Sequence, residues 1–183
     1  KAAELIALAD KALKTNKWRN ALNFLELAQK QYKNNVAVLQ ALGKYNLRIQ
    51  KIDAAKSYYE KALKLNPRLD VQKDLGWINL KAKKYPIAIG LLSEKKKKNP
   101  ADYEAYNLLI RCYYETGRYE TAMELSKMIM DANPSLPCFA NNYFIAFVLN
   151  SNGKSIPPKS KSEQKDNPFI EYNLSVVTEE ELS

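Results

Sequence analysis

Histidine is absent from the 183 residues of the chain, and cysteine occurs only twice. Histidine is the side chain most often used for acid–base chemistry near neutral pH and for binding transition metals. Cys112 and Cys138 lack the close paired spacing of a zinc site or a redox motif. We therefore expect these residues to contain no catalytic site, no metal site and no cofactor site.

Glycine is also scarce, with five residues in the chain. The sequence has no glycine-rich phosphate loop or nucleophile elbow, and SNGKS at 151–155 lacks the upstream glycine that a phosphate loop requires. No apolar run approaches the length of about eighteen residues that a membrane span needs. The chain begins at Lys1 without a basic and apolar leader, and we expect it to be part of a longer intracellular protein located in the cytoplasm.

Acidic residues are fewer than basic residues over most of the chain. Lysine and arginine number 29 against 20 aspartates and glutamates, which gives a formal net charge of +9. From Glu163 onward six acids and one lysine give a charge of −5, so the preceding residues carry +14. This asymmetry favours acidic partners and predicts weaker binding as salt rises, because exposed charges are screened beyond about 8 Å at physiological ionic strength.

What the sequence does contain is a repeat. An alanine recurs at intervals of 34, 33 and 34 residues, at Ala21, Ala55, Ala88 and Ala122. A large side chain stands three residues before each alanine, at Trp18, Ile52, Tyr85 and Tyr119. Fifteen residues after each of these come Lys33, Pro67, Pro100 and Pro134. Self-similarity at this period is typical of helical repeat arrays.

Each repeat is predicted to be a pair of helices, because its apolar residues follow the three-to-four-residue spacing of an amphipathic helix. In the second repeat we expect a first helix at 36–50, a turn, and a second helix that ends at Pro67. The predicted array covers 1–149, with units near 2–35, 36–68, 69–102 and 103–136 and an extra helix at 137–149. Gly43 and Gly76 fall at corresponding places in first helices, where the cost of glycine, roughly 1 kcal/mol against alanine, indicates close packing.

Several segments resemble the tetratricopeptide repeat family, whose unit of 34 residues has an aromatic and glycine opening, a central alanine and a closing proline. They are LQALGKY (39–45), YYEKALKLNP (58–67), DLGW (74–77), YNLLIRCY (106–113) and YETAMEL (119–125). The resemblance implies an all-α fold, an α-solenoid of about four helix-turn-helix repeats followed by a terminal helix and an extended tail. The sequence departs from the pattern at Lys33, at Lys95 and at Ile110.

The resemblance also implies a peptide-binding groove lined by the first helix of each unit. The positions that would face it are Gln40, Lys44, Arg48, Lys73, Trp77, Lys81, Asn107, Arg111 and Tyr114. In such a groove amides bond a peptide backbone, cations hold carboxylates and aromatic rings cover apolar side chains. The alternative is that the cations are merely solvated and that Trp77 and Tyr114 belong to the core.

The function predicted from these features is that of a protein-interaction scaffold or adaptor, whose ligand is an acidic protein or peptide segment with apolar anchors. One alternative is a helical-repeat module that binds RNA, for which the lysine run EKKKKNP at 94–100 is the strongest signal. That run also suits the C-terminal end of a helix, where cations interact favourably with the helix dipole. A second alternative is a recruitment or regulatory module of a larger enzyme.

The C-terminal part of the sequence changes character twice. Residues 150–168 are rich in serine, proline, lysine and asparagine and are predicted to be a linker. Apolar residues return at 169–183, which we interpret either as the start of a further domain or as a docking segment. The apolar helix 137–149 is expected to be covered either by the tail or by a further segment of a longer protein. Two other possibilities are that the tail 163–183 binds the array and that copies of the chain associate through helix 137–149.

Overall fold

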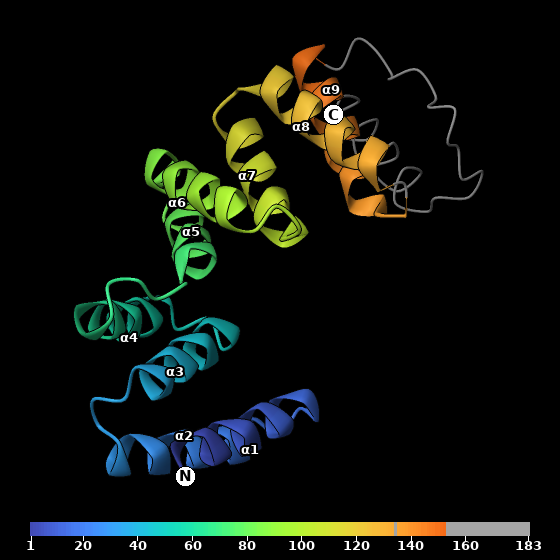
Figure 1. Ribbon diagram of the computed structural model, residues 1–183. Helices are drawn as coiled ribbons and strands as arrows, with labels where there is room; N and C mark the ends of the chain where they lie inside the picture. The colour runs from blue at the N-terminus through green and yellow to red at the C-terminus, as the bar shows by residue number, and fades with distance from the viewer. Residues whose placement is uncertain (134, 153–183) are drawn as a thin grey trace, which may run out of the picture. The chain divides into compact units, whose positions relative to one another are not determined.

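The computed structural model describes residues 1–133 and 135–152, and within these residues it contains helices and no strands. Figure 1 shows the helices in chain order. Their bounds are α1 (Ala2–Lys14), α2 (Trp18–Gln31), α3 (Val36–Arg48), α4 (Ile52–Leu65), α5 (Gln72–Lys81), α6 (Tyr85–Lys98), α7 (Tyr103–Glu115), α8 (Tyr119–Ala132) and α9 (Pro137–Asn150). The predicted all-α fold of helix-turn-helix repeats followed by a terminal helix is therefore confirmed. The predicted tail, and most of the predicted linker, lie outside the described residues.

Each helix pair is joined by the same short turn. Its middle residue takes a left-handed backbone conformation, with φ of 56° at Asn16, 62° at Gln50, 55° at Lys83 and 73° at Gly117. In the first turn Lys17 N donates to Ala12 O at 2.8 Å and Asn16 N donates to Leu13 O at 3.2 Å. These two bonds form a Schellman motif, which satisfies the last carbonyls of the helix and reverses the chain. The other three turns repeat both bonds, so the repeat in the sequence is also a repeat in the backbone.

The second helix of a pair ends at an asparagine in the last three repeats. Asn66, Asn99 and Asn133 are the C-cap residues of α4, α6 and α8. The side-chain oxygen of Asn66 accepts from Arg68 N at 3.1 Å, and that of Asn99 accepts from Ala101 N at 3.2 Å. Asparagine is therefore favoured here because its side chain supports the turn into the next repeat.

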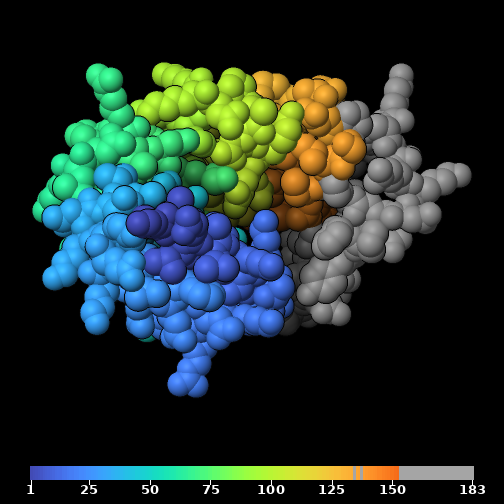
Figure 2. Space-filling view, turned by 60° about the horizontal axis from the view of Figure 1, so that its bottom comes forward, coloured from blue at the N-terminus to red at the C-terminus, as the bar shows by residue number. Residues whose placement is uncertain are grey.

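The helices divide between two compact units, Lys1–Ile78 and the residues from Asn79 onward. The boundary lies inside α5, and therefore inside the predicted third repeat of residues 69–102. The first unit contains two apolar clusters, one built around α1 to α3 and one that joins α4 to α5. Figure 2 shows one face of the surface of this unit, coloured from blue to green.

The second unit likewise has two apolar clusters. Ala88 and Leu92 of α6 pack with Ala105, Leu109 and Cys112 of α7 in the first of them. The second is formed by α7, α8 and α9. The four alanines that define the repeat, Ala21, Ala55, Ala88 and Ala122, are completely buried in the two units. This burial explains why the position is held small in every repeat.

One glycine marks a close approach between helices. A Cβ atom placed on Gly43 in α3 would lie 2.8 Å from Cε1 and 2.9 Å from Cζ of Tyr59 in α4. Tyr59 is fully buried, and its hydroxyl donates to Asp74 Oδ2 at 2.8 Å. Burial, with the Asp74 carboxylate and its hydrogen bond, raises the pKa of Tyr59 above its usual value, so the phenol stays protonated. The prediction that Gly43 allows close packing is confirmed, and the contact is with a tyrosine ring.

Candidate binding surface

The clearest group of predicted site residues lies on α3. Gln40, Lys44 and Arg48 are spaced by four residues, which places their side chains along one face of the helix. Gln40 is half-buried, whereas Lys44 and Arg48 are exposed. Neither cation has an ion-pair partner among the residues that the structure describes. The face is thus positively charged and can bind carboxylates.

The predicted site residues of α5 have the same spacing but a different environment. Lys73 and Trp77 are half-buried, and Lys81 is exposed. Trp77 packs against the cluster formed by Ala55, Tyr59, Val71 and Ile78, so at least part of its ring belongs to the core. Lys73 and Trp77 belong to the first unit, and Lys81 belongs to the second.

The third group of predicted residues lies on α7 and includes an amide pair. The side-chain oxygen of Asn107 accepts a hydrogen bond from Asn142 Nδ2 of α9 at 2.6 Å. Asn142 was not predicted as a site residue, and the signal that would have identified it is its spacing of 35 residues from Asn107. The bond does not use the amide NH₂ group of Asn107, which is half-buried, whereas Asn142 is buried at 8% exposure.

The charged residues of α7 lie next to this amide pair along the helix. Arg111 Nε lies 3.8 Å from Glu115 Oε1, and both side chains are substantially exposed. Glu115 Oε2 accepts a hydrogen bond from the Tyr85 hydroxyl at 3.3 Å, which connects α7 to α6. Arg111 therefore has an internal carboxylate partner, and a ligand carboxylate would have to compete with Glu115 for it.

Tyr114 is the second predicted aromatic platform, and it is partly a core residue. Its side chain is half-buried against the cluster that contains Ile110, Ile129 and Phe139. Burial raises the pKa of the Tyr114 phenol, and the nearby Arg111 opposes that shift. Like Trp77, Tyr114 can offer a ligand only the part of its ring that the core leaves uncovered.

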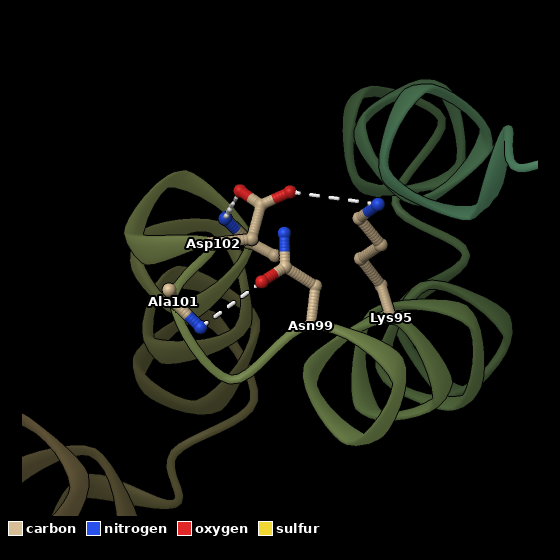
Figure 3. A network of polar contacts seen from close by, with 5 residues as sticks. Lys95, Asn99, Ala101 and Asp102 are labelled. Atoms are coloured by element: carbon tan, nitrogen blue, oxygen red, sulfur yellow. Dashed lines mark hydrogen bonds and ion pairs between the residues drawn. The ribbon is translucent and has the colours of Figure 1, made fainter.

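Most lysines of the run at the end of α6 contact other side chains of the protein. Lys95 Nζ lies 3.7 Å from Asp102 Oδ2, and both side chains are 11% exposed (Figure 3). The other oxygen of Asp102 accepts from Ala105 N at 3.2 Å and thereby caps α7. Lys96 lies over the Tyr106 ring at 5.6 Å, and Lys98 pairs with Glu94 at 2.7 Å. Three of the four lysines thus have structural contacts, which favours the helix-end interpretation of the run over nucleic-acid binding.

The two cysteines are not poised as nucleophiles. Burial raises the pKa of Cys112 to about 11, and it also raises the pKa of Cys138. Because the thiolate is the reactive form, both side chains are mainly protonated at neutral pH. In residues 1–133 and 135–152, no group of three or more histidine, cysteine, aspartate and glutamate side chains is arranged to hold a metal ion. Nor is any helix in these ranges long and apolar enough to cross a membrane.

Comparisons with known proteins agree with this architecture. Two family models described as tetratricopeptide repeat match residues 36–69 and 79–137, together about half of the chain. No curated protein matches the sequence.

Three solved structures illustrate the likeness of fold. MamA from Desulfovibrio magneticus RS-1 has a TM-score of 0.72 at 22% identity, over 95% of this chain and 96% of that one. YrrB, described as a TPR protein with an unusual peptide-binding site, has a TM-score of 0.70 at 17% identity, over 96% and 92% of the two chains. PilF of Pseudomonas aeruginosa has a TM-score of 0.67 at 18% identity, over 88% and 79%.

Proposed function

Because this chain belongs to the tetratricopeptide repeat family, we propose that it is a protein-interaction scaffold that binds an acidic peptide segment on the exposed faces of its first helices. The observation that carries the proposal is the cationic face of α3, where Lys44 and Arg48 are exposed one helical turn apart. Long cationic side chains that lack internal partners can form charge-assisted hydrogen bonds with the carboxylates of a ligand. The strongly basic residues before the tail favour the same class of partner.

The remaining predicted positions suit other parts of a peptide. The amide NH₂ group of Asn107, which the bond to Asn142 leaves unused, can donate to a carbonyl group of a peptide backbone. Trp77 and Tyr114 are half-buried aromatic side chains, and their uncovered edges can contact apolar anchors of a ligand. YrrB supports a peptide as the class of ligand, since its description names a peptide-binding site. The α3 face of the first unit is then the charged site, and the α7 face of the second unit is the amide site.

Charge reversal on α3 tests the proposal. Peptides would be selected from a random library on the parent protein, and their Kd values measured by fluorescence anisotropy at low and physiological salt. In the variant Lys44→Glu/Arg48→Glu, the Kd for acidic peptides is expected to rise about tenfold or more, because two attractive charges become repulsive. The loss is expected to be smaller at higher salt, where exposed charges are screened.

The chain offers a matched control for this experiment. Lys30 and Lys33 are exposed lysines at the end of α2, outside the predicted site. Lys30→Glu/Lys33→Glu makes the same change in net charge and is expected to leave the Kd close to that of the parent. Equal weakening by both double variants would show that only net charge matters, and it would refute the α3 site.

The same titration distinguishes the alternatives predicted from the sequence. Binding of mixed-sequence single-stranded RNA with a steep loss of affinity on adding salt, together with failure to select any peptide, would contradict the proposal. A recruitment module of a larger enzyme would use a peptide surface of the same kind, so the test applies to it unchanged.

A further inference from the structure

The terminal helix α9 is unusual because it carries no charged residue. Its sequence is PCFANNYFIAFVLN, and apolar side chains occur on every side of it. A helix with this pattern is normally buried all round, since one exposed to water on one face has polar residues there. The position of α9 after the last complete helix pair raises the question of what covers it.

The helix α7 shows how a first helix is covered in this unit. One face of α7, with Ala105, Leu109 and Cys112, packs against α6 of the preceding repeat. A different face, with Tyr106 and Ile110, packs against α8 and α9, which follow it in the chain. A first helix thus needs two partners, one that precedes it and one that follows it.

The apolar cluster that α9 shares with α7 and α8 covers only one of these two faces of α9. Phe139 and Ala146 belong to that cluster. At about 100° per residue, Phe144 is turned about 140° from Phe139, and Val148 is turned about 160° from Ala146. Phe144 and Val148 are nevertheless only 5% and 8% exposed. This second face, Phe144 and Val148, corresponds to the face of α7 that meets the following elements.

We propose that the second face of α9 is the docking site of the chain's own C-terminal segment, residues 169–177. Six of these nine residues are apolar, and Glu171 is the one charged residue among them. Such a segment suits a helix face that has no charge to pair with. The preceding residues 153–168 are polar and provide the connection.

The length of the connection fits this assignment. A random coil of 16 residues, the length of segment 153–168, has a root-mean-square span of about 22 Å. The 14 residues of α9 form a helix about 21 Å long. Phe144 and Val148 lie within about 12 Å of the end of α9, so a linker of this span reaches both side chains. A short linker gives an effective local concentration in the millimolar range, so even a weak apolar contact is occupied. This site differs from the peptide surface of the proposed function, and its test uses a different readout.

Hydrogen–deuterium exchange on the intact chain tests the assignment. The variant Leu174→Asp/Val176→Asp introduces two charges into the apolar segment and leaves the repeats unaltered. Backbone amides 144–150 are expected to exchange about tenfold faster or more than in the parent, the factor equivalent to losing one buried aliphatic side chain. Exchange in α1–α4 is expected to stay unchanged, and circular dichroism checks that the helices persist.

A control variant and a second measurement keep the assignment falsifiable. Ser155→Asp/Ser160→Asp adds the same charge within the linker and is expected to leave exchange in α9 as in the parent. Exchange in α9 that is equal in all three proteins would overturn the proposal. So would protection of α9 that depends on protein concentration and accompanies dimers in sedimentation velocity, because the occupant would then be a second copy.

Discussion

Replacing Asp102 by asparagine is expected to lower the free energy of unfolding by about 3 kcal/mol. Asp102 and Lys95 are both nearly buried and lie 3.7 Å apart, so the substitution removes the negative charge of Asp102 from beside a desolvated ammonium group. Asparagine is as good an N-cap as aspartate, and its oxygen can still accept from Ala105 N. The decrease in the free energy of unfolding therefore reports the lost ion pair and not a lost helix cap.

Two further substitutions isolate the buried pair in urea unfolding followed by circular dichroism. Glu94→Gln removes the partner of Lys98 from an ion pair on the same helix in which both side chains are about half exposed, and it is expected to cost about 0.5 kcal/mol. Lys95→Ala places at this position the residue found at Ala28 and Ala62 of earlier repeats. In that background Asp102→Asn is expected to cost less than 1 kcal/mol, because no buried cation remains. An equal cost of Asp102→Asn with and without Lys95 would contradict this account.

The repeat register could be predicted from the sequence because it depends on side-chain volume. Four alanines at matching positions are all buried, and a larger side chain there would meet the neighbouring helix. The helix turns gave a much weaker signal. Only Gly117 among the four left-handed turn residues is a glycine, whereas Asn16, Gln50 and Lys83 take the same conformation because two backbone hydrogen bonds hold each turn.

The candidate site was predictable only in part, for a similar reason. Helical spacing placed Gln40, Lys44 and Arg48 on one face, because that depends on the geometry of one helix alone. The hydrogen bond between Asn107 and Asn142, and the pairing of Lys95 with Asp102, cross between helices. Such contacts depend on how consecutive repeats pack, which a single sequence without paired positions does not specify.

Lys95 illustrates how a departure from a repeat pattern can be compensated. Its position is occupied by alanine in the first two repeats and by Ile129 in the fourth, so a buried cation conflicts with the pattern. The carboxylate that balances it comes from the N-cap of the next helix, where an acid is already favoured by the free backbone amides. One aspartate therefore serves both the cap and the buried charge.

A pair of glycine substitutions is expected to give effects of opposite sign. Gly43→Ala is expected to destabilise the first unit by about 2 kcal/mol, because the new Cβ would lie 2.8 Å from the Tyr59 ring. The ring has little freedom to move, since it is fully buried and its hydroxyl is bonded to Asp74 at 2.8 Å. This overpacking, about 3 kcal/mol at its upper range, exceeds the gain of about 1 kcal/mol from replacing glycine in a helix.

Gly90→Ala provides the matched control in α6. Gly90 is exposed, and a Cβ atom placed on it would meet nothing within 4 Å. Only the helix-propensity term then remains, so we expect a stabilisation of about 1 kcal/mol. Thermal and urea unfolding of both variants would measure the two effects. If Gly43→Ala were as stabilising as Gly90→Ala, the contact between α3 and Tyr59 could not be as close as the structure shows, and the packing of α3 against α4 would have to be revised.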